Sequence, residues 1–321
     1  MSEGILRVGV VGTGALGSHH ARVFAGLPDA KLVSVFDLDP VKAKSVGEPF
    51  GAETAGSLAE LIDRIDAAVV AVPTVAHAEV AAKLLGAGRH VLVEKPITST
   101  LEDAEALVAL AAEKHVVLQV GHVERFNPAA EALQRIGTPR FVEVHRLSPF
   151  PNRSLDIDVI LDLMIHDLDL LLALDKSKAV QIDAVGVPVL TDRVDIANVR
   201  IRFESGLIAN LTASRVSAEK IRKFRVFGSR LYASCDFITR KAQVAKLVIG
   251  EGGAPEIRME AIGSGTTDPE SEPLRRQAKA FVGACAGRHA PVVSGADGLA
   301  VLRMAKEILD KMGGMGPTGQ S

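Results

Sequence analysis

The sequence predicts an α/β protein in two parts: a doubly wound parallel sheet, and then an α+β domain with a mostly antiparallel, open-faced sheet. The first part is indicated by short apolar strands that alternate with helical patterns, and by a glycine-rich turn after the first strand. The second part is indicated by strand patterns, joined by turns, that dominate from about residue 140 onward. We place the domain boundary between residues 1–121 and residues 122–321.

The glycine-rich turn has the pattern G-x-G-x-x-G. Residues 5–11 form an apolar strand that leads into Gly12-Thr13-Gly14-Ala15-Leu16-Gly17 and then into a helical pattern. A dinucleotide-binding turn requires this order of strand, turn and helix. The first glycine permits the tight turn, the second lets a pyrophosphate approach the backbone, and the third lets helix and strand pack closely. The helix N-terminus supplies N–H groups and a partial positive charge.

An acidic residue follows at the spacing expected for ribose recognition. The second strand, residues 31–36, ends at Asp37, which lies 20 residues beyond Gly17. A carboxylate at this place accepts hydrogen bonds from the adenosine ribose and repels a 2′-phosphate. Leu38, rather than an arginine, comes next. The sequence therefore predicts NAD, rather than NADP, as the cofactor.

Further apolar strands at residues 67–72, 90–93 and 116–120 bring the located strands to five, in a sheet that we expect to contain six parallel strands. Ligands bind at the carboxyl edge of such a sheet, so we assign the polar residues after these strands to the cofactor site. They are Pro73, Thr74, His77, Glu94 and Lys95. Two alternatives stay open, namely that the charges after residue 93 are only a solvated strand end, and that His77 is a helix-surface histidine.

The composition excludes several classes of protein. Apolar residues make up 47% and charged residues 24%, and the net charge of −2 does not favour a nucleic-acid or membrane binder. Cys235 and Cys285 are too few for a disulfide framework and lack metal-ligand spacing, so we expect no metal and a cytoplasmic setting. We expect neither a signal peptide nor a membrane-spanning segment.

One helix of the second domain is unusual. Residues 158–172 are largely apolar, yet Asp162 and His166 are spaced i and i+4 and share a helix face. A buried carboxylate or imidazole is unfavourable unless paired, and an Asp–His pair can hold one imidazole tautomer and raise its basicity. We predict a catalytic pair. A polar edge of a surface helix and a metal pair are the alternatives, although no third soft ligand stands out.

The rest of the second domain reads as about six strands and two closing helices. The strands are expected at residues 140–148, 180–187, 197–203, 207–214, 221–227 and 241–249, and the helices at 273–287 and 295–312. Such a sheet commonly has one packed and one open face. The open face either caps the cofactor crevice or forms a subunit interface, and we expect a homodimer or homotetramer.

Five motifs together resemble the glucose–fructose oxidoreductase / inositol dehydrogenase / MocA family over nearly the full length. They are Gly12-x-Gly14-x-x-Gly17, Ala71-Val72-Pro73-Thr74-x-x-His77, Glu94-Lys95-Pro96, Arg125-Phe126-Asn127-Pro128 and Asp162-x-x-x-His166. The resemblance implies reversible hydride transfer at a sugar or cyclitol hydroxyl. It implies that Lys95, Asp162 and His166 flank the reacting carbon beside the nicotinamide, and that Arg125 and Asn127 contact the substrate.

Two segments, residues 158–169 and 213–223, are similar to a narrower group, the UDP-N-acetylglucosamine 3-dehydrogenases. Those enzymes act before an aminotransferase on the route to amide-linked lipid A. The resemblance implies a nucleotide-sugar substrate, and Arg215 and Lys220 belong to a basic cluster that can meet its diphosphate. A solvated face or an oligomer contact is the alternative. Alternate strand residues face opposite ways, so at most half of the cluster can point at one ligand.

Two other functions stay open at this point. The chain can be a dehydrogenase of a free sugar or inositol, since the wider family resemblance does not depend on a nucleotide. It can also be a non-catalytic, NAD-binding regulator. Retention of Lys95, Asp162 and His166 together argues against the regulator.

Overall fold

The computed structural model describes residues 4–150, 157–250, 254–263 and 265–313. The chain forms two units: unit 1 comprises residues 1–123 and 273–302, and unit 2 comprises residues 124–272 and 303–321. Residues 273–302, which the sequence analysis placed in the second domain, thus pack with unit 1.

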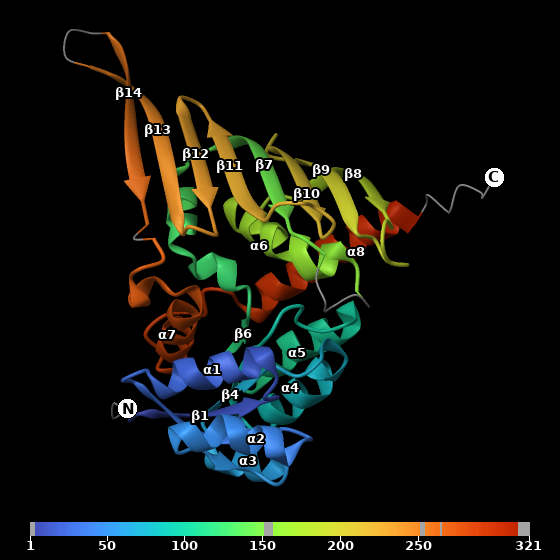
Figure 1. Cartoon of the computed structure of the whole chain (residues 1–321), viewed down its shortest axis with the longest axis vertical. Coiled ribbons are helices and arrows are strands. Elements are labelled where there is room, and N and C mark those ends of the chain that lie inside the picture. Colours follow the sequence, from blue (N-terminus) through green and yellow to red (C-terminus); the bar gives the residue numbers. More distant parts are fainter. Residues whose placement is uncertain (1–3, 151–156, 251–253, 264, 314–321) are drawn as a thin grey trace. The chain divides into compact units, whose positions relative to one another are not determined.

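Unit 1 contains a six-stranded parallel sheet with the order β3-β2-β1-β4-β5-β6 (Figure 1). Its strands are β1 (Leu6–Val11), β2 (Ala30–Phe36), β3 (Glu53–Thr54), β4 (Ala67–Val70), β5 (His90–Val93) and β6 (Leu118–Val120). The strand order reverses between β1 and β4, and in open α/β sheets this switch point is where ligands bind. The predicted doubly wound parallel sheet is confirmed.

Helices cover both faces of this sheet. They are α1 (Ala15–Ala25), α2 (Pro40–Gly47), α3 (Leu58–Arg64), α4 (His77–Gly86), α5 (Leu101–Glu113), α7 (Pro273–Cys285) and the start of α8 (Gly295–Gly313). Gly9 of β1 lies against Leu61 of α3, whereas the next residue, Val10, lies near Gly17 of α1. Phe24 of α1 meets Phe281 of α7 edge-on, with ring centroids 6.4 Å apart. This contact explains why α7 belongs to unit 1.

Unit 2 contains an eight-stranded sheet with the order β14-β13-β12-β11-β7-β10-β9-β8 (Figure 1). Its strands are β7 (Pro139–Leu147), β8 (Ala179–Val187), β9 (Ile196–Phe203), β10 (Ile208–Ser214), β11 (Ile221–Gly228), β12 (Leu231–Asp236), β13 (Lys241–Ile249) and β14 (Pro255–Ile262). The pair β7–β10 is parallel, and the other neighbouring pairs are antiparallel. The mostly antiparallel sheet is confirmed, with β12 and β14 added to the six strands that the sequence predicted.

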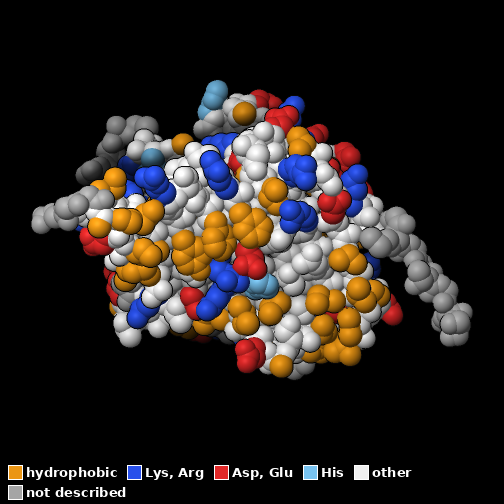
Figure 2. Space-filling model, turned by 90° about the horizontal axis from the view of Figure 1, so that it is seen from above, with side chains coloured by type: hydrophobic (Ala, Val, Ile, Leu, Met, Phe, Trp, Pro, Cys, Tyr) orange, Lys and Arg blue, Asp and Glu red, His pale blue; other side chains and the backbone are white. Residues whose placement is uncertain are grey.

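The two faces of the unit 2 sheet differ. The covered face packs against a π turn (η5, Ile160–Met164), the helix α6 (Ile165–Leu174) and a 3₁₀ segment (η4, Pro128–Arg135). Burial alternates along β7 and β9 accordingly. The other face carries a row of three aromatic rings. The ring centroids of Phe141 and Phe227 lie 5.7 Å apart, and those of Phe227 and Tyr232 lie 4.9 Å apart. Figure 2, which looks down on this part of the molecule, shows hydrophobic side chains gathered among basic and acidic ones.

Candidate active site

The glycine turn of unit 1 has the geometry that a bound pyrophosphate requires. Gly12 has a φ of 87°, and a Cβ there would lie 2.7 Å from the carbonyl oxygen of Ala71. A Cβ on Gly17 would lie 1.8 Å from the carbonyl oxygen of Gly12, so only glycine allows this close packing. A Cβ on Gly14, in contrast, would meet nothing within 4 Å. The open space beside Gly14 at the start of α1 therefore fits a phosphate.

Asp37 stands at the end of β2 beside this turn. Its Oδ2 accepts hydrogen bonds from the backbone N–H and the hydroxyl of Thr13, at 2.7 and 2.9 Å, and its Oδ1 accepts from the Asp39 N–H at 3.0 Å. Burial alone would raise the pKa of Asp37, but these hydrogen bonds and the charge of Lys42 bring it below its ordinary value. The carboxylate thus keeps the negative charge that disfavours a 2′-phosphate.

His77 is buried and links the chain segments that follow two neighbouring strands. Its side chain is 1% exposed, with Nδ1 2.9 Å from the carbonyl oxygen of Pro96 and Nε2 3.0 Å from that of Val72. Burial lowers the pKa of His77. This corrects the helix-surface interpretation, and it gives His77 a role in holding the turns after β4 and β5. Pro73 is exposed and Thr74 is half-buried at the same edge.

Glu94 and Lys95 follow β5 directly. Lys95 is half-buried, whereas Glu94 is 7% exposed. Glu94 Oε1 lies 2.7 Å from Nε2 of His20 on α1, and Oε2 accepts the Lys95 backbone N–H at 3.3 Å. The sequence analysis assigned Glu94 to the cofactor. The structure instead turns its carboxylate into unit 1, so we reassign Glu94 to the support of the Lys95 turn.

Asp162 and His166 lie on one continuous helical segment of unit 2. Asp162 belongs to the π turn η5, and His166 is the second residue of α6. Both side chains are half-buried. The sequence predicted a single α-helix here, and the π turn is an unforeseen difference. Such turns insert one residue into a helix and are frequent at functional sites because they redirect the side chains around them.

Two buried ion pairs fix this helix to unit 2. Arg146 of β7 donates from Nε and Nη2 to Asp167 at 2.7 and 2.8 Å, and from Nη1 to Glu124 at 3.0 Å. Arg125 forms a bidentate pair with Asp169 at 2.9 and 2.6 Å. The sequence analysis missed the first pair. It expected Arg125 to contact the substrate, and the structure places its guanidinium on Asp169 instead.

Two further predicted substrate residues are corrected by their burial. Asn127 is 2% exposed and caps η4, since its Oδ1 accepts the Ala129 N–H at 3.1 Å while its Nδ2 donates to Glu124 and to a backbone carbonyl. Arg215 is 0% exposed and donates from Nε to Asp195 at 2.7 Å. Neither side chain is presented to a ligand from solvent, because each is already held by protein acceptors.

The remaining guanidinium nitrogens of Arg215 hold the chain just before the helical segment of Asp162 and His166. Nη1 donates to the carbonyl oxygen of Ile157 at 2.7 Å, and Nη2 donates to the Thr191 hydroxyl at 3.0 Å. Asp195 in turn accepts three backbone N–H groups of residues 189–191. Of the predicted diphosphate residues, Lys220 is exposed in the β10–β11 connection and stays a candidate.

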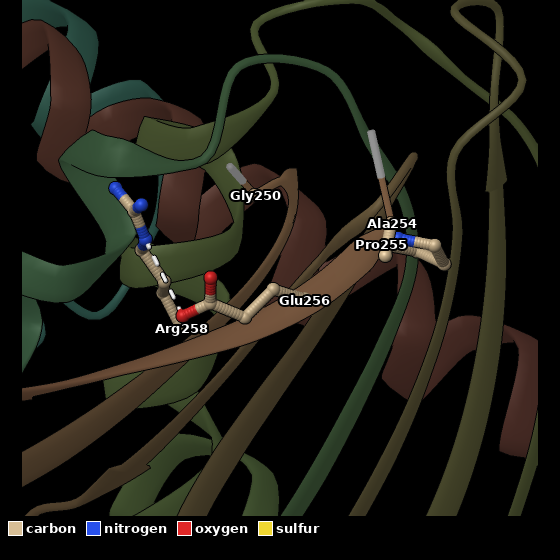
Figure 3. A pocket seen from close by; sticks show the side chains of 5 residues that line it. All are labelled: Gly250, Ala254, Pro255, Glu256 and Arg258. Atoms are coloured by element: carbon tan, nitrogen blue, oxygen red, sulfur yellow. Dashed lines mark ion pairs between the residues drawn. The ribbon is translucent and has the colours of Figure 1, made fainter. Parts of the chain in front are cut away.

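Two other features carry no part of this chemistry. A pocket at the β13–β14 hairpin is lined by Gly250, Ala254, Pro255, Glu256 and Arg258 (Figure 3). The Glu256–Arg258 ion pair spans 3.7 Å there, and the pocket contains none of the predicted site residues. Within the described ranges, no cluster of three or more metal-ligating side chains occurs. The helices in these ranges are too short or too polar to cross a membrane.

Comparison with known proteins gives the family. Residues 6–122 match the model of the GFO/IDH/MocA oxidoreductase family with an NAD-binding Rossmann fold, and residues 129–233 match the GFO/IDH/MocA C-terminal domain. The chain belongs to the GFO/IDH/MocA family. As a member of this family it is an NAD-dependent oxidoreductase, and the prediction of NAD as cofactor is confirmed.

Several members of the family are similar along most of their length. UDP-N-acetylglucosamine 3-dehydrogenase of Acidithiobacillus ferrooxidans is 38% identical over 94% of this chain and 96% of its own. A solved structure of that enzyme covers 96% of this chain and 97% of its own, with a TM-score of 0.88. Inositol 2-dehydrogenase of Rhizobium meliloti is 28% identical over 94% of both chains.

Proposed function

We propose that the protein oxidises the C3 hydroxyl of UDP-N-acetylglucosamine to a ketone with NAD. The observation that carries this proposal is the 38% identity to the Acidithiobacillus enzyme of that activity, which extends over nearly the whole of both chains. The fit of the glycine turn to a pyrophosphate and the ionised Asp37 support NAD as the partner of the reaction.

His166 is our proposed general base. In the oxidation, its imidazole takes the proton of the substrate hydroxyl while the carbon loses its hydride. Asp162, one helical turn earlier, orients the imidazole and stabilises the imidazolium that forms. Both side chains are half-buried, so they are accessible while the helix behind them is fixed by Arg146 and Arg125.

Lys95 is our proposed hydrogen-bond donor to the same oxygen. An ammonium there stabilises the negative charge that develops on oxygen as the proton leaves. Bound NAD supplies the hydride acceptor. The proposal requires that Lys95 of unit 1 and the Asp162–His166 pair of unit 2 act on one substrate molecule, as the family resemblance implies.

Lys220 is our proposed contact to the substrate diphosphate. It is exposed, whereas Arg215 is buried in an ion pair, so burial separates these two members of the predicted cluster, which also includes Arg222 and Lys223. A lysine is a flexible point charge suited to a phosphate in a solvated position.

A second candidate function is oxidation of a free sugar or of inositol. The 28% identity to inositol 2-dehydrogenase over 94% of both chains favours it, because the catalytic residues do not depend on the nucleotide. A regulator that binds NAD without turnover is a third possibility, and absence of turnover with every polyol and nucleotide sugar would favour it.

A substrate panel tests the proposal. The purified protein is mixed with NAD and with UDP-N-acetylglucosamine, free N-acetylglucosamine, glucose or myo-inositol, and the absorbance of NADH is followed. An aminotransferase and an amino donor are added in parallel, because removal of the ketone pulls an unfavourable equilibrium forward. We expect NADH with UDP-N-acetylglucosamine. Turnover of inositol alone would support the second function instead.

We further propose a homodimer or homotetramer that associates through the open face of the unit 2 sheet. The half-buried aromatic and exposed apolar side chains on that face favour a protein interface, and light scattering of the purified chain measures the mass. An aminotransferase that consumes the ketone is the proposed pathway partner. The two free cysteines favour the cytoplasm as the compartment.

A further inference from the structure

A buried acid–imidazole pair lies directly behind the candidate catalytic lysine. His20 is 0% exposed on α1, and its Nε2 lies 2.7 Å from Oε1 of Glu94. The other oxygen of Glu94 accepts the backbone N–H of Lys95. A Cβ on Gly121, which follows β6, would lie 3.0 Å from the Glu94 carboxylate. Three segments of unit 1 therefore meet around this one carboxylate.

The hydrogen bonds indicate which of the two side chains is the donor. Within the described residues, Nδ1 of His20 is buried and has no hydrogen-bond partner. A buried N–H without an acceptor is more unfavourable than a bare nitrogen lone pair, so the proton of His20 belongs on Nε2, where it is donated to Glu94. In this arrangement Nε2 of His20 is the donor and the carboxylate of Glu94 is the acceptor.

Lys95 supplies the compensating positive charge. Burial alone would raise the pKa of Glu94, but the hydrogen bond from His20, the electrostatic attraction between these two side chains and the charge of Lys95 together outweigh it, and the pKa is lowered. The attraction is mutual, so an ionised Glu94 stabilises the ammonium form of Lys95. Other titratable side chains of the surrounding elements are His77 on α4, whose pKa is lowered by burial, and His122 after Gly121.

We propose that His20 and Glu94 are positioning residues of Lys95: His20 holds Glu94 as a buried anion through its hydrogen bond, and this anion keeps Lys95 as an ammonium donor. The inference rests on the proposed function, because it takes Lys95 as the group that contacts the substrate oxygen. It deepens that function by deciding whether Lys95 or His166 accepts the proton of the substrate hydroxyl. Lys95 keeps its protons throughout, so the proton of the hydroxyl goes to His166.

The test measures the titration of Lys95 itself. Lysines of the NAD-bound protein are reductively methylated with ¹³C-formaldehyde, and the Lys95 signal is assigned by its absence in Lys95→Met. The signal is then followed by NMR as a function of pH. We expect Lys95 to be protonated at neutral pH in the unchanged protein. A deprotonated Lys95 at neutral pH would overturn the inference without any variant.

Variants then test the pair. Glu94→Gln should lower the midpoint of the Lys95 titration by about one pH unit or more, because the neighbouring anion is lost. His20→Gln keeps an N–H donor near the position of Nε2 and should leave the midpoint close to that of the unchanged protein, whereas His20→Met should lower it. Should Glu94→Gln fail to fold, the two His20 variants still decide the question.

His90→Asn is the matched control. It changes a half-buried histidine at the opposite end of β5, where His90 accepts the Val117 N–H, and it should leave the Lys95 titration unchanged. NAD affinity shows that unit 1 is intact in each variant. An unchanged Lys95 midpoint in a folded, NAD-binding Glu94→Gln protein would refute the inference. Because this titration needs no substrate, failure of the proposed function is seen separately, as a lack of turnover in the panel.

Discussion

The two units use their polar residues in different ways. In unit 1 the cofactor turn can be recognised within six residues: a Cβ on Gly12 or Gly17 would clash with backbone atoms, whereas Gly14 leaves open space at the start of α1. In unit 2 the helix of Asp162 and His166 is held by charged partners that are distant in sequence. Asp169 pairs with a residue 44 positions away, Asp167 with one 21 away, and the Asp195–Arg215 pair spans 20.

This difference teaches how a basic residue near a site should be interpreted. An arginine is suited to a diphosphate and equally suited to a buried carboxylate, since both accept two parallel hydrogen bonds. Arg125, Arg146 and Arg215 all bind carboxylates of unit 2 itself. Lys220 is exposed and has the freedom to meet a ligand. The predictions below test this division, beginning with the largest expected effect.

The sharpest contrast is between Arg215 and Lys220. Arg215→Met leaves Asp195 buried without its cation, so we expect a loss of roughly 3–5 kcal/mol in the free energy of unfolding. Lys220→Ala changes an exposed side chain and should alter it by about 0.5 kcal/mol or less. Urea unfolding followed by circular dichroism measures both. A stable Arg215→Met protein with a strongly raised KM would show that Arg215 binds the substrate after all.

The stability that Asp195 provides should also depend on pH. Burial alone would raise the pKa of Asp195, but three backbone N–H groups and Arg215 lower it far below its ordinary value. A carboxylate with a lowered pKa in the folded state stabilises the fold above its unfolded pKa of about 4, and this contribution is lost as the pH falls toward the folded value. The difference in urea midpoint between the unchanged protein and Asp195→Asn should therefore shrink below that pH. If the two proteins differ in urea midpoint by the same amount above and below a pH of about 4, Asp195 does not stabilise the fold in this way.

The catalytic residues form the next test. Lys95→Met and His166→Asn should each lower kcat by about two orders of magnitude, or about 2.7 kcal/mol, while NAD binding survives. The double variant should lose far less than the product of the two, because in the proposed mechanism both side chains act on one oxygen in one transition state. In oxidation, the rising limb of the pH profile should disappear in His166→Asn. Near-unchanged kcat with the same limb would show that His166 is not the base.

Cofactor choice tests unit 1 alone. Asp37→Ala should weaken NAD binding about tenfold, or about 1.4 kcal/mol, and reduce the preference for NAD over NADP, because the lost carboxylate contacts the ribose and repels a 2′-phosphate. Titration of each protein with NADH and with NADPH, followed by the change in cofactor fluorescence, gives both affinities. Equal NAD affinity in the variant would mean that Asp37 only accepts hydrogen bonds from Thr13 and Asp39 and does not contact the ribose.

The smallest effect is expected at Lys220. Lys220→Ala should raise KM for UDP-N-acetylglucosamine a few-fold with kcat unchanged, because it removes binding common to the ground and transition states. Added salt should raise KM in the unchanged protein more than in the variant, since an exposed charge is screened. Initial rates at two salt concentrations are sufficient. An unchanged KM would show that Lys220 does not contact the substrate diphosphate, and it would favour oxidation of a free sugar.

The sequence predicted what local patterns determine and missed what distant partners determine. The cofactor turn and the parallel strands follow from patterns within a few residues. The pairing of Asp162 with His166 stays a prediction, since a π turn takes the place of the regular α-helix there. The edge strand β14 was missed although Ile257, Met259 and Ala261 alternate there with charged residues, and nearly all of its side chains are exposed. The burial of Asn127 and Arg215 depends on acceptors elsewhere in the chain, and spacing carries no information about them.

The proposed function is tested most directly by the fate of one hydrogen. UDP-N-acetylglucosamine is prepared with deuterium at C3 and, as a control, with deuterium at C4, and each is incubated with the protein and NAD. The account predicts that deuterium from C3 appears in the reduced nicotinamide and that deuterium from C4 does not. Reduced cofactor without deuterium from the C3-labelled sugar would contradict oxidation at C3 and with it the roles given to Lys95, Asp162 and His166.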